Sequence, residues 1–224
     1  MMAKTLVIGA HGQVGQILVQ DLASKQQEVL AAFRNKDQLQ TVADVAGVEG
    51  VYFDLDVDEQ TMTQFFLDHQ VGQIVFTAGA GGKGGIERTV EVDLDGAIKT
   101  MAAAKKASVA HYVMVSAAGA DDRGRWSASG IYHYFMMKHY ADLYLQNSGL
   151  DYTIVRPTLL LDTTGTGKVS LDVDFAGPKE SLQIPRADVA AFVIAVLAHP
   201  EQAANQIYDL TAGHQEIQHI FDEK

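Results

Sequence analysis

Three side chains of this sequence could together move a proton to or from a substrate oxygen. Tyr134 and Lys138 place a phenol and an ammonium four residues apart in a segment with helical character, and residues at that spacing share one face of a helix. A phenol has an ordinary pKa of about 10, and a nearby ammonium favours the phenolate and should bring that pKa closer to neutrality. Ser116 could donate a hydrogen bond to the same oxygen. We therefore expect Ser116, Tyr134 and Lys138 to be catalytic, although a tyrosine and a lysine at this spacing also occur by chance as a surface contact.

A glycine-rich turn near the N-terminus could hold phosphate groups. The apolar run 4–8 leads directly into the sequence GAHGQVG at 9–15, and apolar residues then recur at helical spacing. Glycines let the backbone turn tightly and approach a ligand, and the first turn of a helix directs free N–H groups at anions. The pattern predicts a pyrophosphate site. Its expected contacts are Gly9, His11, Gly12, Gln13, Val14 and Gly15, with His11 either at a phosphate or facing solvent.

The residue after the second apolar run bears on which dinucleotide is bound. An acid there would accept hydrogen bonds from the ribose of NAD, but this chain has Arg34, whose guanidinium can pair with the 2′-phosphate of NADP. Lys36 could assist, or the segment 34–37 could be a solvated loop. We expect NADP, with NAD as the second choice. Asp54, beside Leu55, would accept from the adenine amino group or cap its own turn.

Apolar runs that read as strands alternate with helix-like segments along almost the whole chain. The expected strands are 4–8, 29–33, 51–53, 73–77, 111–115, 152–155 and 206–210, and the expected helices include 59–69, 86–107, 130–147 and 186–198. Irregular structure is expected at 78–85, 119–129 and 161–183. Strict alternation predicts an α/β fold with a doubly wound parallel sheet of the Rossmann type, in three layers α/β/α.

In such a sheet, ligands bind beyond the carboxyl ends of the strands. This rule adds Ala78, Gly79 and Pro157 to the expected cofactor contacts, along with Lys138 at the nicotinamide ribose. No repeat, charge block or linker divides the chain, so we expect one dinucleotide-binding domain over 1–224, with substrate loops from the C-terminal third. The loop residues Arg123, Arg125 and Trp126 would line the substrate mouth or lie on the surface, and Arg186 and Asp188 would form an internal ion pair or a helix start.

Composition narrows the possible partners. The formal net charge of -11 argues against nucleic acid and anionic membrane as partners. The chain has no cysteine, and its eight histidines show no metal-ligand spacing, so no metal site is expected. The longest apolar stretch, 187–198, includes Asp188 and is too short for a membrane span. We expect a cytoplasmic protein, a monomer or homodimer, that acts on a small molecule.

An ordered set of short motifs resembles one known family. These motifs are GAHGQVG (9–15), FTAGAGG (76–82), VDLDGAIK (92–99), HYVMVSA (111–117), YFMMKHYAD (134–142), SGLDYTIVRP (148–157) and PRADVA (185–190). The chain resembles an atypical short-chain dehydrogenase/reductase of the small NAD(P)H-binding branch, which includes NmrA-like and biliverdin-reductase-B-like proteins. The resemblance implies a Rossmann-type fold, NAD(P) binding and oxidoreductase or epimerase-like activity. The family's helical asparagine has no clear counterpart, and Asp93 is only its neighbour.

These observations predict an NADP(H)-dependent oxidoreductase that acts on a small carbonyl, quinone or flavin-like acceptor. One alternative is a non-catalytic NADP(H) sensor that reports to a partner protein. A second alternative is a sugar-nucleotide epimerase or dehydratase, which the short chain beyond the sixth strand disfavours because little remains for a substrate lobe.

Overall fold

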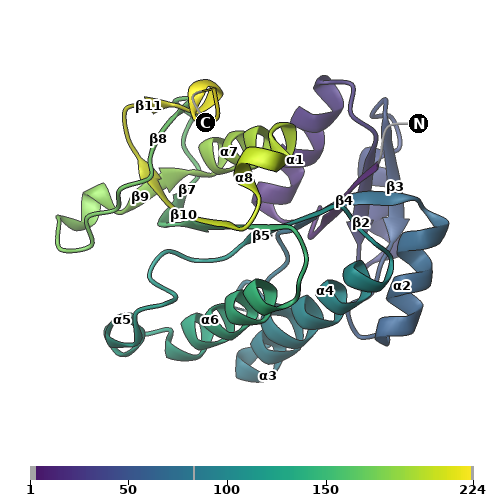
Figure 1. Ribbon diagram of the computed structural model, residues 1–224, viewed down its shortest axis with the longest axis horizontal. Helices are drawn as coiled ribbons and strands as arrows, with labels where there is room; N and C mark the ends of the chain where they lie inside the picture. Colours follow the sequence, from purple (N-terminus) through teal and green to yellow (C-terminus); the bar gives the residue numbers. More distant parts are fainter. Residues whose placement is uncertain (1–3, 83, 223–224) are drawn as a thin grey trace.

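A nine-stranded sheet runs through the middle of the computed structural model, which describes residues 4–82 and 84–222 (Figure 1). The strand order is β11-β8-β10-β6-β5-β4-β1-β2-β3. Its parallel part consists of β1 (Lys4–Ile8), β2 (Val29–Phe33), β3 (Val48–Tyr52), β4 (Val71–Phe76), β5 (His111–Val115), β6 (Tyr152–Pro157) and β10 (Gln206–Ala212). The short strands β8 (Lys168–Ser170) and β11 (Gln215–Glu216) extend it antiparallel. The predicted doubly wound Rossmann-type sheet is therefore confirmed.

The central strands form because their side chains can be buried on both faces of the sheet. Every residue of β2 and of β5 is buried, as expected for parallel strands covered by helices on both sides. Val7 of β1 aligns with Ala31 on one side and Val75 on the other. This register brings the carboxyl ends of β1, β2 and β4 to the same edge.

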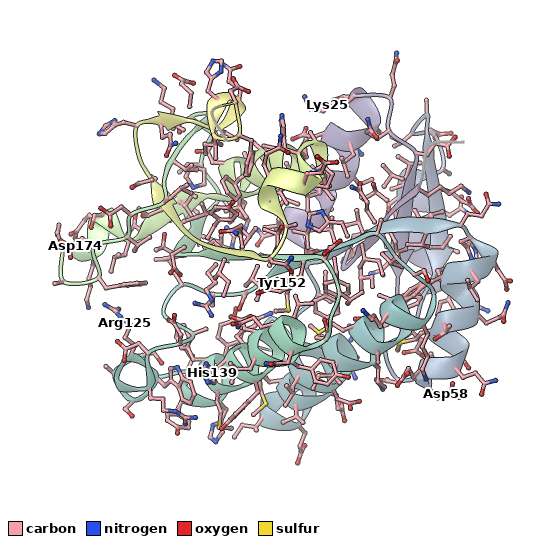
Figure 2. The ribbon with its side chains drawn as sticks, in the orientation of Figure 1. Lys25, Asp58, Arg125, His139, Tyr152 and Asp174 are labelled. Atoms are coloured by element: carbon pink, nitrogen blue, oxygen red, sulfur yellow. The ribbon has the colours of Figure 1, made fainter. Side chains whose placement is uncertain are left out.

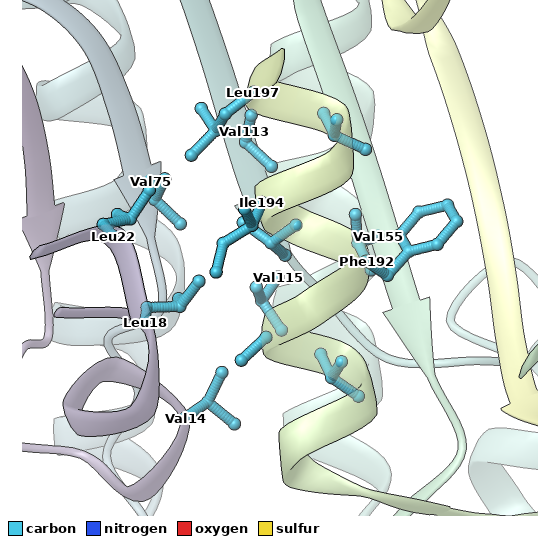
Figure 3. Close-up of a cluster of buried hydrophobic side chains, with 14 of the residues drawn as sticks. Val14, Leu18, Leu22, Val75, Val113, Val115, Val155, Phe192, Ile194 and Leu197 are labelled. Atoms are coloured by element: carbon cyan, nitrogen blue, oxygen red, sulfur yellow. The ribbon is translucent and has the colours of Figure 1, made fainter. Parts of the chain in front are cut away.

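Helices cover both faces (Figure 1). One face carries α1 (Gln13–Ser24) and α7 (Arg186–Ala198), and the other carries α2 (Glu59–Asp68), α4 (Ala97–Lys106) and α6 (Tyr132–Asn147). Figure 3 shows how Leu18 and Leu22 of α1 and Ile194 of α7 meet over the valines of the central strands. Because this packing fixes α1 against the sheet, it also fixes the turn from which α1 starts.

The predicted helix 86–107 has a different local geometry from the one expected. It consists of α3 (Gly85–Thr89), a π-helical segment η2 (Val90–Gly96) and α4. A π-helical turn is wider than an α-helical turn and is frequently found at functional sites. It changes which face each later residue occupies, and here it buries Asp93 with only 1 % of the residue exposed.

Two segments predicted to be irregular contain regular structure. The first, 119–129, includes α5 (Arg123–Ala128), whose N-terminus is capped by the carboxylate of Asp122. The second, 161–183, includes β8 and the 3-10 turn η3 (Lys179–Ser181). The two segments meet beside the sheet, where Figure 2 shows Arg125 and Asp174 at the same edge of the molecule.

The remaining short elements lie around the sheet. They are η1 (Lys36–Val42), β7 (Leu159–Leu161), which pairs with β9 (Gln183–Pro185), α8 (Pro200–Ala203) and η4 (Ile217–His219). Across residues 4–82 and 84–222, no helix combines the length and apolar character needed to cross a membrane.

Candidate active site

The glycine turn between β1 and α1 tolerates little besides glycine at two of its three positions. Gly9 has a φ of +96°, and a Cβ placed there would lie 2.6 Å from the backbone nitrogen of Ala78. A Cβ on Gly15 would overlap the carbonyl oxygen of Gly9. The amide of Gly12 donates to that same carbonyl at 2.9 Å. The turn is thus held in one compact shape by its own backbone.

The start of α1 is built to receive an anion. Gly12 is the N-cap residue, no side chain caps the helix, and no acidic residue occupies its first turn. The first amides of a helix have no partner within the helix, and they carry a partial positive charge. A bare glycine backbone in front of these amides fits a diphosphate, as expected from the sequence. The side chains of Gln13 and Val14 point elsewhere: Gln13 donates to Asp162 at 3.1 Å, and Val14 is buried in the core.

A cavity of about 250 Å³ opens beside this turn. Its wall includes Gly9, His11, Gly12, Leu55, Ala78 and Gly79 from the predicted cofactor set. Two guanidiniums, those of Arg34 and Arg88, also line it, while no carboxylate among the described residues does. Arg88 is held by Glu91 at 2.9 Å and Asp56 at 3.3 Å. Arg34 is exposed and, within the described residues, has no hydrogen bond or ion pair.

Asp54 lies outside the wall of this cavity. Its carboxylate accepts from the hydroxyl of Tyr52 at 3.1 Å and from the amide of Asp56 at 2.9 Å. The structure therefore shows Asp54 capping its own turn, which is the second of the two roles predicted for it. Lys36 lies over the ring of Tyr52, 5.2 Å from its centroid.

A larger cavity of about 960 Å³ adjoins the first, and Ala80 borders both. Ser116, Tyr134 and Pro157 lie in its wall, each from a different element of the predicted site. Much of the remaining wall is apolar, with Ile86, Ile131, Leu159, Leu160 and Leu182 among its residues. An extended ligand could thus lie with one end at the glycine turn and the other beside Ser116 and Tyr134.

Lys138 lies behind Tyr134, within the protein. Its ammonium is 5.6 Å from the centroid of the Tyr134 ring and 3.0 Å from a carboxylate oxygen of Asp93. Only 3 % of Lys138 is exposed. The second carboxylate oxygen of Asp93 accepts from the amide of Ala80 at 2.9 Å. Asp93 was predicted to be only a neighbour of the family's missing asparagine, but in the structure the π-helical segment directs it at the lysine.

Lys138 lowers the pKa of Tyr134 as predicted, but the expectation that this pKa lies closer to neutrality was wrong. Burial raises the pKa of the Tyr134 phenol, and Lys138 lowers it, but Asp93 and Asp142 add to the increase. The phenol therefore has a pKa above its ordinary value of 10. Burial alone would lower the pKa of Lys138, but Asp93, Tyr134 and Asp142 outweigh burial and raise it. The phenol is therefore protonated and the ammonium charged at neutral pH.

A second buried ion pair supports the wall behind Ser116. Arg156 donates from Nε to Asp142 at 2.8 Å and from Nη1 to Asp121 at 2.7 Å. Burial raises the pKa of Asp142 to about 6, opposed by Arg156 and by the hydroxyl of Ser116. Asp142 shares α6 with Tyr134 and Lys138, so this pair fixes the helix that carries them.

The predicted substrate-loop residues have separate roles. Arg125 lines the large cavity, and it donates to the carbonyl oxygen of Phe175 at 2.7 Å. Trp126 is fully buried and donates to the carbonyl of Ala120, while Arg123 lies over its ring at 4.8 Å.

Arg186 and Asp188 both lie in the first turn of α7 but do not pair with each other. Arg186 lines the large cavity and bonds Asp162 at 2.7 Å, and Asp188 instead accepts from the amides of Thr166 and Gly167. In the glycine loop 79–85, Lys83 lies outside the described residues. Within the described part of the chain, no group of three or more acidic, histidine or cysteine side chains is placed to hold a metal ion.

Comparisons with known proteins agree with this geometry. Residues 9–200 match a family model described as NAD(P)H-binding. An uncharacterized sugar epimerase, YhfK of Bacillus subtilis, is 38 % identical over 210 residues, covering 94 % of each chain. A putative NAD-dependent epimerase/dehydratase from Bacillus halodurans superposes with a TM-score of 0.88 at 30 % identity, covering 99 % of this chain and 100 % of that one. ChuY, an anaerobillin reductase from Escherichia coli O157:H7, gives a TM-score of 0.71 at 25 % identity over 93 % and 96 % of the two chains.

Proposed function

This chain belongs to the NAD(P)H-binding family, and we propose that it is an NADP(H)-dependent reductase of a small carbonyl, quinone or flavin-like acceptor. The observation that carries the proposal is the junction of the two cavities at Ala80. The smaller cavity has the anion-binding turn and the free Arg34 at its wall, and the larger one has a phenol and a hydroxyl. A dinucleotide placed along this path would present its nicotinamide end to an acceptor in the larger cavity.

The walls of the larger cavity favour an apolar acceptor. Ile86, Ile131 and Leu159 are 51 %, 52 % and 63 % exposed, which is unusual for side chains of this size when they lie together around one opening. An apolar, planar acceptor would cover them and gain their burial. A sugar would leave these exposed apolar side chains uncovered. The reductase activity named for ChuY supports the same choice, while the name of YhfK keeps the epimerase as the competing function.

The protein's own residues supply the proton and the orientation. Bound NADPH would supply the hydride. Tyr134 donates its phenolic proton to the acceptor oxygen, and the resulting phenolate is stabilised by the ammonium of Lys138. The hydroxyl of Ser116 orients the acceptor oxygen beside the phenol. A phenol that is protonated at neutral pH, as its raised pKa requires, suits this donor role.

Arg34 favours NADP over NAD. It stands at the wall of the smaller cavity, has no carboxylate partner within the described residues, and carries a charge that a 2′-phosphate would match. In an acidic protein, a guanidinium left unpaired at the rim of a cavity is well suited to an anionic ligand.

The test is NADPH oxidation, followed at 340 nm, with an aliphatic aldehyde, a naphthoquinone, riboflavin and a UDP-sugar as acceptors. We expect turnover with at least one of the first three. Substituting Tyr134→Phe should lower kcat for a carbonyl acceptor about 100-fold or more, because it removes the proton donor. Tyr144→Phe is the matched control, since Tyr144 lies on the same helix and is exposed.

Other outcomes would each reject the proposal in a distinct way. Tight NADPH binding without turnover on any acceptor would identify a cofactor sensor. Conversion of the UDP-sugar to its epimer when NADP⁺ or NAD⁺ is supplied in place of NADPH, with no net change in the nucleotide, would identify an epimerase. A kcat equal to that of the wild type in Tyr134→Phe would remove Tyr134 from the proton path.

A further inference from the structure

Lys138 has a buried carboxylate as its closest charged partner. Asp93 contacts the ammonium at 3.0 Å, and the two residues are 1 % and 3 % exposed. The carboxylate also accepts from the amide of Ala80 at 2.9 Å, and a Cβ on Gly79 would lie 3.0 Å from it. Asp93 therefore joins η2, the loop after β4 and helix α6 at a single point behind Tyr134.

We propose that Asp93 is a positioning residue that offsets the charge of Lys138 and so keeps Tyr134 protonated, which prepares this site for reduction at neutral pH and moves the reverse oxidation of an alcohol to higher pH. The inference rests on the proposed function, because it specifies the protonation state from which the same phenol, lysine and serine act. Asp93 contacts Lys138 directly and acts on Tyr134 through that lysine.

The charges around the phenol support this role. An ammonium alone would act on Tyr134 as a full positive charge in a dry environment, where electrostatic interactions are strong. A carboxylate 3.0 Å from the ammonium turns that charge into a dipole, whose effect at the ring is far weaker. Asp142 is the other acid acting on Tyr134, and it is itself paired with Arg156 at 2.8 Å. Burial has the largest effect on the pKa of Tyr134, and the pairing of Lys138 with Asp93 determines how far the ammonium opposes it.

The pH at which each direction of the reaction is fastest follows from the protonation state of the phenol. Oxidation of an alcohol, and epimerisation through a ketone, both need a phenolate to take the hydroxyl proton. Reduction needs a phenol to give one. With Asp93 present, the raised pKa of Tyr134 leaves little phenolate at neutral pH, so the residue is ready to donate a proton there, whereas the base role needs a higher pH.

The experiment is a pH titration by NMR of protein labelled with ¹³C at the ζ carbon of tyrosine. The chain has eight tyrosines, and the resonance of Tyr134 is assigned by its loss in Tyr134→Phe. We expect Tyr134 in the wild type to titrate above pH 10. In Asp93→Asn, the unpaired ammonium should move that titration down by at least one pH unit. Asp95→Asn is the matched control, because Asp95 lies on the same segment but pairs with Lys99 at the surface.

A double variant distinguishes an electrostatic effect of Asp93 on Tyr134 from a folding defect. In Asp93→Asn/Lys138→Met both charges are removed together, so Tyr134 should titrate close to its wild-type value. A merely structural role for Asp93 would instead move Tyr134 equally in the single and the double variant. A wild-type titration below pH 10, or no change in Asp93→Asn, would overturn the proposal.

This readout does not depend on turnover. If the predicted titrations are found but no acceptor is reduced, the proposed function fails while the pairing of Asp93 and Lys138 stands. If an acceptor is reduced but the titrations do not shift, the reductase stands and the role of Asp93 fails.

Discussion

Arg34 carries the most specific chemical information of any residue in the cofactor cavity. The glycines bind a diphosphate, which NAD and NADP share, and only a contact near the adenosine ribose can separate the two. Arg34 is exposed at the wall of the 250 Å³ cavity and is held by no acid among the described residues. Its planar guanidinium can make two parallel hydrogen bonds to a phosphate.

We predict that Arg34→Gln weakens NADPH binding about tenfold or more and leaves NADH binding nearly unchanged, because a hydrogen bond to a charged group contributes about 1.5–3 kcal/mol. Calorimetric titration of both nucleotides measures this. Lys25→Gln removes a charge at the opposite end of α1 and should change neither affinity. A wild type that prefers NADH would contradict the assignment of NADP.

The convergence of Ser116 and Tyr134 on one cavity could be predicted from the sequence, but the partner of Lys138 could not. Ser116 directly follows a fully buried strand, and a parallel sheet places such residues at its ligand-binding edge. The face that Asp93 occupies depends on the π-helical turn at 90–96, and helical periodicity does not reveal such a turn. Without the burial of Tyr134 and that contact, the direction in which its pKa shifts could not be obtained.

At the scale of elements, a buried polar chain links β5, β6 and α8. Thr153 donates to the carbonyl oxygen of Ala203 at 2.7 Å, so its hydroxyl accepts from Nε2 of His111 at 2.9 Å. His111 is 1 % exposed, and its Nδ1 lacks a hydrogen-bond partner among the described residues. Burial lowers the pKa of His111 to about 4, opposed by Asp151. The imidazole is therefore neutral in the folded protein.

We predict that His111 makes the fold sensitive to acid. Between its ordinary pKa of 6.5 and about 4, the unfolded chain binds a proton that the folded chain does not, so stability falls as the pH decreases through this window. The loss from this one group is about 3 kcal/mol at most. Urea unfolding at pH 7 and pH 4.5 should show a smaller loss for His111→Gln than for the wild type.

The exposed His214 provides the control, and His214→Gln should behave like the wild type. An equal pH dependence in His111→Gln and the wild type would show that His111 does not act as described.

The long elements could be predicted from the sequence, and the short ones could not. Strand 111–115 and helix 186–198 were predicted with the observed bounds. A buried strand and a largely buried helix both appear in the sequence as long apolar runs, which are easy to recognise. The pairs β7–β9 and β8–β11 involve strands of only two or three residues. Such short strands form because they pair with a neighbouring strand, and the β-propensity of their own residues does not predict them. Helix α5 contains a glycine and few apolar residues, and it depends on the Asp122 cap and on the burial of Trp126.

At the scale of the whole molecule, charge is distributed unevenly. The chain carries a net charge of -11. Within residues 4–82 and 84–222, however, the ionisable side chains lining the smaller cavity are Arg34, Arg88 and His11, and the only carboxylate lining the larger one is Asp93, which is paired. A local positive field at an anion site is compatible with an acidic surface elsewhere.

The resemblance to atypical short-chain dehydrogenases/reductases, first based on seven short motifs, is confirmed by the match of residues 9–200 to the NAD(P)H-binding family.

The central claim is that the backbone at the Gly9–Gly15 turn binds the diphosphate of a nicotinamide dinucleotide. Gly12 tests it best, because its φ of −69° suits any residue and a Cβ there has a single neighbour, the carbonyl oxygen of Gly9 at 3.2 Å. Gly12→Ala should therefore fold with little loss of stability and yet block the close approach of the ligand. Gly124→Ala is the matched control, since its Cβ would also meet one oxygen, at 3.1 Å, in a different helix.

The decisive measurement is a calorimetric titration of NADPH into the wild type, Gly12→Ala and Gly124→Ala, with urea unfolding of each. We predict one NADPH per chain in the wild type and in Gly124→Ala, and an affinity at least about tenfold weaker, or 1.4 kcal/mol, in Gly12→Ala at nearly unchanged stability. Equal affinity in all three proteins, or no binding by the wild type, would contradict the account.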